Sequence, residues 1–434
     1  MKALIIGAAR SGIAITKLLV KQGYDCVLLD QKSVDQSQFE NLESIQIIEG
    51  EHPHSLWDIS FDLIIKNPGI PHTNEFVQGF VKLGYFIYNE IEIALRYAPH
   101  YQIGAITGTN GKTTTTSMLE ALLKQKNINN TACGNIGLAM SEVVYQNGNI
   151  SLDCALEIAA FQLLGCETFK PKISTILNLA PDHLDVFKDV NEYYDAKCRV
   201  FMNQDETDIF LKNIDDANIV RLTHDVKAQC YTFSLKKNAD IHIVGNNVYF
   251  NDVELFDFTK LKVPGMHNVS NAMVACAMAY LMGVEPYQIK QTIESFCGVE
   301  HRLEFVRSLN TVEFYNDSKA TTAESTVVAL EAFDQQVLLL AGGYDKKTGF
   351  ESLRPYLSKV KYLIAFGDTK NQFQELYPET SLVENMYEAI DLAYNLAKNG
   401  DKIVLSPACA SYDQFDNYEQ RGRLFKEYVN SLKD

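Results

Sequence analysis

The chain has 434 residues, of which 46% are hydrophobic and 22% charged, a composition typical of ordinary globular proteins. This length exceeds that of one ordinary domain and predicts about three. The net charge of −16 argues against nucleic-acid binding, which needs a surplus of Lys and Arg. Small anions remain possible ligands, because a few local cations can hold them.

Nine scattered cysteines without a Cys-x-x-Cys pair favour reduced, mostly buried thiols over a disulfide framework. Arg10 and Lys17 interrupt the apolar N-terminus, and no cleavage pattern follows. The longest apolar run, 272–284, is shorter than a bilayer span and predicts a buried helix. We therefore expect a cytoplasmic monomer without membrane or nucleic-acid partners.

The first segment, residues 1–97, alternates strand and helix patterns. Strands are expected at 2–6, 24–29 and 62–66, and a helix at 11–22. Continuous apolar strands separated by helices are typical of a parallel sheet that is covered on both faces. We predict a Rossmann-like domain.

A glycine-rich turn, GAARSG, follows the first strand. It departs from the dinucleotide fingerprint because Ala9 replaces the middle glycine, while Asp30 ends the second strand where a ribose partner would lie. A Cβ at that position obstructs a pyrophosphate, which argues against NAD and a dehydrogenase. Nucleotide binding and a tight turn needed only for packing remain equally good interpretations.

The second segment, residues 98–298, opens with a strand, the turn GTNG and a helix. Its sequence TGTNGKTTT has a shorter glycine spacing than the usual phosphate loop. The amides of 109–112 can surround phosphate oxygens, Lys112 can reach terminal phosphates, and the Thr113 hydroxyl can bind Mg²⁺. A Thr-rich helix start with an incidental lysine is the weaker alternative. Short strand-like runs over 209–261 predict an insertion.

Acidic residues follow two later strands of this segment. Glu157 lies within the apolar run CALEI, and a buried carboxylate is costly unless it is paired or metal-bound. Asp182, His183 and Asp185 follow STILNL, where α/β sheets place ligands. A metal or phosphate role is therefore favoured, although Glu157 turned to solvent is the alternative.

Two further patterns are weaker when taken alone. Lys197 in the helix NEYYDAKCRVF has the features of a surface lysine. Asn268 and Asn271 share one helix face, where two amides could contact a purine, but helix capping is the favoured interpretation.

The third segment, residues 299–434, resumes the alternation. Strands are expected at 311–316, 336–343, 362–367 and 401–407, and a final helix begins near 415. Polar and cationic side chains follow these strands or precede the first one: Arg302, Asp317, Ser318, Lys319, Thr321, Lys346, Ser411, Tyr418 and Arg421. Such a set suits a small acidic substrate held by its carboxylates, whereas each residue alone could be a solvated loop residue.

Taken together, TGTNGKTTT, NLAPDHLD, YYDAKCR, GMHNVSNA, HRLE, NDSKAT and SPACASYDQFDNYEQRG resemble the Mur ligase family of ATP-dependent amino-acid ligases in peptidoglycan synthesis. The phosphate loop alone also fits folylpolyglutamate synthases. The two C-terminal motifs are most similar to those of the members that add D-glutamate, and a family ligase for another amino acid is the alternative. A non-catalytic nucleotide sensor would lack the acid–His–Lys set.

This resemblance implies three α/β domains: a Rossmann-like domain for the UDP-sugar, a P-loop ATPase-like centre, and a Rossmann-like domain for the amino acid. UDP-N-acetylmuramoyl-L-alanine would contact Arg10, Ser11, Asp30, Gln31, Lys32, Asn67, Pro68, Gly69, Asn135 and His183. ATP would contact Gly108, Thr109, Asn110, Gly111, Lys112, Thr113, Thr114, Asn268, Asn271, Arg302 and Asp317. D-glutamate would contact Lys319, Thr321, Lys346, Ser411 and Tyr418.

The resemblance also implies two Mg²⁺ ions, with ligands Thr113, Glu157, His183 and a carbamylated Lys197. Lys112, His183, Lys197 and Arg302 would be the catalytic residues. The chain departs from the family where Ala159 and Ala160 replace two usual serines, which removes any contact those hydroxyls make. Tyr418 and Thr322 replace a common phenylalanine and asparagine, and neither change removes a charge.

Overall fold

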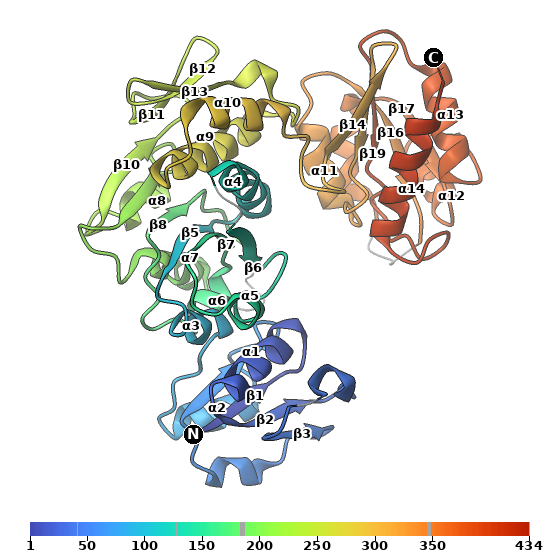
Figure 1. Ribbon diagram of the computed structural model, residues 1–434. Helices are drawn as coiled ribbons and strands as arrows, with labels where there is room; N and C mark the ends of the chain where they lie inside the picture. The colour runs from blue at the N-terminus through green and yellow to red at the C-terminus, as the bar shows by residue number, and fades with distance from the viewer. Residues whose placement is uncertain (41, 127–128, 183–186, 345–348, 434) are drawn as a thin grey trace. The chain divides into compact units, whose positions relative to one another are not determined.

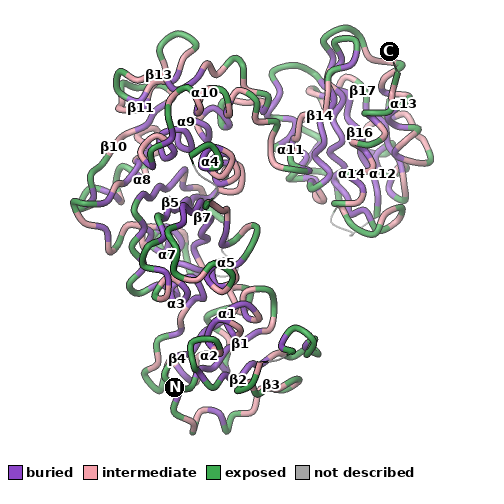
Figure 2. Tube along the Cα trace, viewed as in Figure 1, coloured by how far each residue is buried: buried purple, intermediate pink, exposed green. Residues whose placement is uncertain are grey.

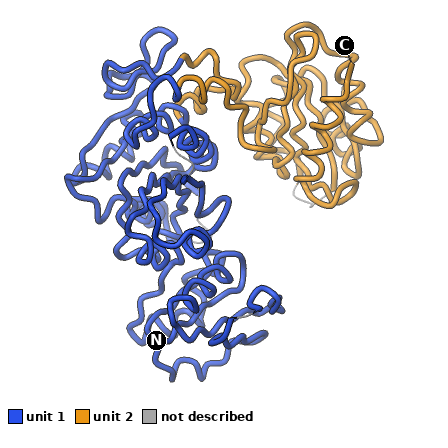
Figure 3. Tube along the Cα trace, in the orientation of Figure 1, with its two compact units in different colours: residues 1–256, 271–289 blue, residues 257–270, 290–434 orange. Residues whose placement is uncertain are grey.

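The computed structural model describes residues 1–40, 42–126, 129–182, 187–344 and 349–433. The chain divides into two compact units, Met1–Phe256 with Asn271–Ile289, and Asp257–Ser270 with Lys290–Asp434 (Figure 3). Three separate sheets are formed, and helices pack against each of them (Figure 1). This confirms the predicted α/β class with three parts, while the boundaries at 97 and 298 stay predictions.

The N-terminal sheet is fully parallel, with the strand order β3-β2-β1-β4. Its strands are β1 Lys2–Ile6, β2 Asp25–Asp30, β3 Ile45–Glu49 and β4 Leu63–Lys66. Its helices are α1 Arg10–Lys21, α2 Glu75–Lys82 and α3 Glu90–Leu95. The three predicted strands are confirmed as β1, β2 and β4. Their apolar runs are buried on both faces of the sheet. Edge strand β3 was not predicted. Its sequence, IQIIE, mixes polar and apolar residues because the strand is only half-buried.

The central sheet has nine strands in the order β13-β12-β11-β10-β9-β8-β5-β7-β6. These are β5 Tyr101–Thr107, β6 Asn130–Gly134, β7 Leu152–Glu157, β8 Ile173–Ile176, β9 Ile209–Asn213, β10 Gln229–Phe233, β11 Ile241–Val244, β12 Asn247–Phe250 and β13 Val253–Asp257. The helices are α4 Lys112–Lys126, α5 Met140–Asn147, α6 Ala160–Leu163, α7 Val190–Cys198, α8 Ala217–Leu222, α9 Met266–Leu281 and α10 Pro286–Ser295. The predicted insertion strands extend this same sheet, in which β11 and β12 pair antiparallel and β13 forms the edge.

The C-terminal sheet has the order β14-β15-β19-β16-β17-β18, and only β14 pairs antiparallel. Its strands are β14 Glu304–Leu309, β15 Val312–Asn316, β16 Val337–Gly342, β17 Val360–Phe366, β18 Ser381–Leu382 and β19 Lys402–Leu405. Its helices are α11 Ala323–Glu331, α12 Lys370–Leu376, α13 Met386–Leu396 and α14 Tyr418–Ser431. Separate apolar cores lie on its two faces, as expected for a sheet covered on both sides.

Buried residues concentrate on the strands and on the helix faces turned toward them (Figure 2). Short 3₁₀ turns complete the fold at Gln36–Phe39, His54–Asp58, Arg199–Phe201, Phe258–Lys260 and Glu351–Lys359. Across the described ranges, no helix has the length and apolar character needed to cross a bilayer. The carboxyl ends of the parallel strands β5, β7 and β8 meet at one edge of the central sheet, where α/β folds bind ligands.

Candidate active site

The loop between β5 and α4 has the shape that a phosphate-binding loop requires. Gly108 and Gly111 have φ values of 148° and 85°, which favour glycine. A Cβ at Gly111 would lie 2.4 Å from Asn271 Oδ1. Because α4 begins at Lys112, the loop leads directly into the N-terminus of a 15-residue helix, whose dipole favours anions. The shorter glycine spacing thus still gives a glycine turn at a helix start, which is the geometry that phosphate loops use.

Asn178, after β8, holds the loop in place. Its side chain accepts a 2.8 Å hydrogen bond from Asn110 N and donates at 3.0 Å to Asn110 O, while its carbonyl accepts from Thr109 N at 3.0 Å. The Thr109 hydroxyl exchanges hydrogen bonds with the backbone of Ala180. The amides of Thr109 and Asn110 are thus paired within the protein, and the binding of phosphate oxygens by the amides of 109–112 stays a prediction.

Two lysines meet at the carbonyl of Gly108. Lys112 Nζ donates to it at 2.9 Å and to Thr109 O at 2.7 Å, while Lys197 Nζ donates to Gly108 O at 2.8 Å. Lys197 is 1% exposed and lies over the Tyr193 ring at 4.4 Å. Burial, and secondarily the charge of Lys112, lower the pKa of Lys197 to about 7. The surface-lysine interpretation of Lys197 is wrong.

Glu157 at the end of β7 is 1% exposed, so the solvent-facing alternative is also wrong. Its Oε1 accepts a 2.7 Å hydrogen bond from Asn135 Nδ2, while Oε2 is buried without a partner among the described residues. A buried carboxylate oxygen without a donor suits a cation. The predicted ligand His183 lies outside the described residues, and within those that are described no three His, Cys, Asp or Glu side chains form a cluster.

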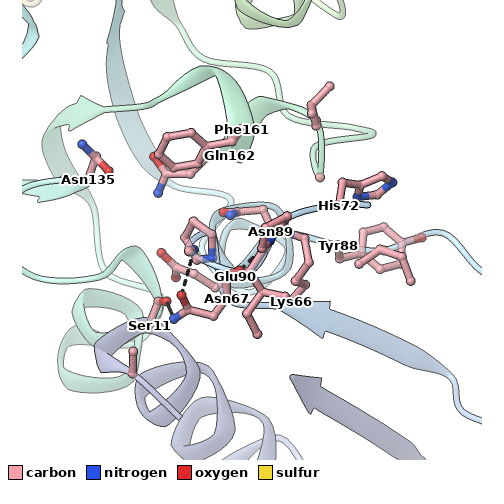
Figure 4. Close-up of a pocket in the computed structure, with 18 of the residues that line it drawn as sticks. Ser11, Lys66, Asn67, His72, Tyr88, Asn89, Glu90, Asn135, Phe161 and Gln162 are labelled. Atoms are coloured by element: carbon pink, nitrogen blue, oxygen red, sulfur yellow. Dashed lines mark hydrogen bonds between the residues drawn. The ribbon is translucent and has the colours of Figure 1, made fainter. Parts of the chain in front are cut away.

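A cavity of about 850 Å³ lies between the end of β4 and the central sheet (Figure 4). Predicted UDP-sugar residues that line it are Arg10, Ser11, Asn67, Pro68, Gly69 and Asn135. Within its wall, Asn67 donates to Ser11 Oγ at 2.9 Å and accepts from Gly69 N at 3.0 Å. The cavity therefore brings together six residues from three distant motifs, and Asn135 connects it to Glu157.

Asp30, Gln31 and Lys32 do not line this cavity. Asp30 instead accepts hydrogen bonds from Ala8 N at 2.7 Å and Lys32 N at 2.8 Å. Its carboxylate thus shapes the glycine-rich turn after β1. The uridine contacts predicted for Asp30, Gln31 and Lys32 stay predictions.

Several cavity residues were missed by sequence reasoning: Lys66, His72, Asn89, Glu90, Phe161 and Gln162. Lys66 directly precedes Asn67, Pro68 and Gly69 but was not predicted as a site residue, and Glu90 begins a short helix that has no recognisable motif. Gln162 accepts from Ala159 N at 2.9 Å. The turn that follows Glu157 is therefore stabilised by this side chain even though Ala159 and Ala160 replace the usual serines.

The two asparagines of α9 have different surroundings. Asn268 Nδ2 donates to Pro264 O at 2.7 Å, which ties the first turn of the helix to the preceding loop. Asn271 lies against Gly111 of the phosphate loop. Contact with adenine stays a prediction for both.

The predicted ligand residues of the C-terminal segment, Asp317 and Arg302 for ATP and the others for D-glutamate, are partly described. Asp317 is 5% exposed and accepts from Leu303 N and Ser406 Oγ, and burial raises its pKa to about 7. Lys319 Nζ lies 5.9 Å from the centroid of the Tyr418 ring, and Ser411 is buried. Thr321 and Arg302 are accessible, and Lys346 lies outside the described residues.

Arg421 does not belong to the set of substrate-facing cations that the sequence predicted. Its guanidinium is fully buried and donates to Ser318 Oγ, Ser318 O, Cys409 O and Ala410 O at 2.9–3.2 Å. Burial lowers its pKa to about 10. The side chain therefore fastens the loops after β15 and β19 to each other.

Comparison with known proteins relates the whole chain to one group of enzymes. Residues 106–279 match the Mur ligase middle domain, and 301–409 match the Mur ligase glutamate ligase domain. The UDP-N-acetylmuramoylalanine–D-glutamate ligase of Bacillus subtilis strain 168 is 38% identical over 442 residues, covering 99% of this chain and 97% of that protein. The enzyme of the same name from Caldicellulosiruptor saccharolyticus is 37% identical, covering 99% of both chains.

Solved structures agree in fold. UDP-N-acetylmuramate–alanine ligase from Thermotoga maritima covers 100% of both chains with a TM-score of 0.57 and 20% identity. A UDP-N-acetylmuramoyl-L-alanyl-D-glutamate–2,6-diaminopimelate ligase covers 100% of this chain and 93% of its own, with a TM-score of 0.58 and 15% identity. At these identities the likeness establishes the fold.

Proposed function

The chain belongs to the Mur ligase family, and from this premise we propose that it joins the L-alanine carboxylate of UDP-N-acetylmuramoyl-L-alanine to the amine of D-glutamate, using ATP. The observation that supports this assignment most is the end-to-end relationship to ligases named for that reaction. The phosphate loop with Lys112 and Lys197, next to a cavity of sugar-nucleotide size, suits the same chemistry. We further propose that the enzyme acts in the cytoplasm as a monomer.

The reaction follows from the poor electrophilicity of a carboxylate. The alanine carboxylate attacks the γ-phosphorus of ATP, giving an acyl phosphate and ADP. The D-glutamate amine then attacks the acyl carbon, and the tetrahedral intermediate expels phosphate as the amide forms and the nitrogen loses a proton. Lys112 and the predicted contact Arg302 would neutralise charge on the transferred phosphoryl group.

The residues around Glu157 fit a cation, because Oε2 has no donor within the described part of the chain. With Glu157, we propose Thr113, His183 and a carbamylated Lys197 as the groups that hold Mg²⁺. Bound there, Mg²⁺ would supply charge neutralisation for phosphoryl transfer. Lys197 is suited to carbamylation, because its lowered pKa leaves much of the amine neutral at pH 7 and able to add CO₂.

The assignment is tested by phosphate release. Purified protein with ATP, Mg²⁺ and UDP-N-acetylmuramoyl-L-alanine should release phosphate with D-glutamate and not with L-glutamate. Release only with another amino acid would assign the chain to a different ligase of the family. ATP binding without any substrate-dependent release would point to a nucleotide sensor instead.

We expect Asn178→Ala to raise the KM for ATP about tenfold with a smaller change in kcat, since the loop loses the two side-chain hydrogen bonds to Asn110. Steady-state kinetics with ATP as the varied substrate measures this. Asn147→Ala, at the end of α5, is the matched control and should leave the KM for ATP unchanged. An unaltered KM in Asn178→Ala would show that the loop is rigid without this side chain.

A further inference from the structure

Lys66 is a buried cation in the wall of the sugar-nucleotide cavity. It ends β4, is 8% exposed and lies beside Asn67 in the cavity wall (Figure 4). Arg10 and Lys188 line the same cavity and are both exposed. Its Nζ donates to Ile70 O at 2.6 Å and to Asn67 O at 3.4 Å. The ammonium thus sits under the 67–70 loop, against its carbonyl groups.

An ammonium has three donors, and these two bonds to neutral carbonyls do not offset the cost of burying its charge. Nowhere in the described ranges does a carboxylate pair with Lys66. Burial accordingly lowers its pKa to about 8. Binding of an anion beside this ammonium would therefore stabilise its charged form strongly, because no carboxylate already does so.

The N-terminus of α1 faces the same cavity. Ala9, Arg10 and Ser11 line it, no side chain caps the helix, and its first turn has no acidic residue. A helix of 12 residues places partial positive charge and unpaired N–H groups at this end. The helix start and Lys66 thus make the cavity attractive to an anionic ligand from two separate elements.

The other titratable groups that line the cavity are His72, Tyr88, Glu90, Glu192, Arg10 and Lys188. Burial and the charge of Lys66 lower the pKa of His72, so this imidazole is mainly neutral at neutral pH. Glu90 is 2% exposed and accepts from Ser141 N at 2.8 Å, and burial raises its pKa. A raised pKa reduces the repulsion that Glu90 would exert on an anion.

We propose that Lys66 binds the diphosphate of the sugar-nucleotide substrate, with its Nζ bridging the 67–70 loop and a phosphate oxygen. This inference rests on the proposed function and adds a binding residue to it. A consequence is coupled proton uptake. At pH 8 the free amine is about half protonated, and the bound diphosphate stabilises the charged form, so about half a proton is taken up per substrate. Affinity should then fall as pH rises above 8.

The test compares Lys66→Met, Lys66→Arg and the exposed control Lys82→Met at the end of α2. Calorimetry with UDP-N-acetylmuramoyl-L-alanine at pH 8, in two buffers of different ionisation enthalpy, gives affinity and proton uptake together. We expect Lys66→Met to bind about 10- to 100-fold more weakly and to lose the uptake. Lys66→Arg should retain part of the affinity, and Lys82→Met should match the wild type.

Further arms separate the alternatives. His72→Gln should retain the proton uptake on binding. If this variant loses the uptake, the proton belongs to His72 and the proposal is overturned. UDP and uridine are also tested as competitors of the sugar nucleotide. Lys66→Met should weaken the binding of UDP and leave that of uridine, which has no phosphate, unchanged. If both bind equally more weakly and the Tm falls, Lys66 has only a structural role and the proposal is overturned. Wild-type affinity in Lys66→Met would overturn the proposal alone, whereas a wild-type protein that binds no sugar nucleotide would overturn the proposed function as well.

Discussion

Lys112→Ala should lower ligation at least about 100-fold while the protein stays folded. The Lys112 ammonium lies at the start of α4, 2.9 Å from Gly108 O and 2.7 Å from Thr109 O, and so is held over the phosphate loop. A positive charge placed there in advance neutralises the transferring phosphoryl group without reorganisation. Its loss affects the transition state more than substrate binding, so kcat should fall most.

Phosphate release at saturating substrates measures this loss, and a thermal denaturation curve checks the fold. The free energy of unfolding should change by no more than about 2 kcal/mol, because Gly108 O keeps its 2.8 Å hydrogen bond from Lys197 Nζ and only Thr109 O loses the donor that Lys112 supplies. Lys124→Ala, an exposed lysine near the end of the same helix, is the matched control. Near-normal turnover in Lys112→Ala would contradict the assignment of this loop as a phosphate-binding loop.

The fold was predictable where local sequence and tertiary environment agree. The apolar runs of β1, β5, β7 and β16 are buried on both faces, so composition alone identifies them as central parallel strands. Edge strand β3 has one accessible side and a mixed sequence, and it was missed. Residues directly after the central strands lie together at the carboxyl end of the sheet, as parallel pairing requires, and their ligand contacts stay predictions.

The roles of single polar residues were less predictable, because they depend on which groups meet in space. Lys197 resembles a surface lysine in its helix, yet the fold buries it against Gly108 and Tyr193. Asn178 was part of a recognised motif, but its double hydrogen bond to Asn110 joins residues 68 positions apart. The charge of Arg421 suggested substrate binding, but the side chain is buried and its hydrogen bonds connect two loops.

Lys197→Ala should be almost inactive and should recover part of its activity when acetate or formate is added. The argument depends on the protonation state of the amine. At a pKa of about 7, half of Lys197 is neutral at pH 7, compared with roughly one in a few thousand for an ordinary lysine. Only the neutral amine can add CO₂ and become an anionic carbamate. A small carboxylate entering the space left by alanine replaces that anion.

The volume of the side chain provides the decisive comparison. Lys197→Met fills the same space, so it should also be inactive yet should not respond to added carboxylates. The wild-type rate at limiting bicarbonate should fall as pH drops below 7, because protonation removes the neutral amine. Full activity in Lys197→Ala without added acid would exclude Lys197 from the chemistry. Equal rescue of both variants would place the carboxylate elsewhere, since methionine leaves no room beside Gly108 and Tyr193.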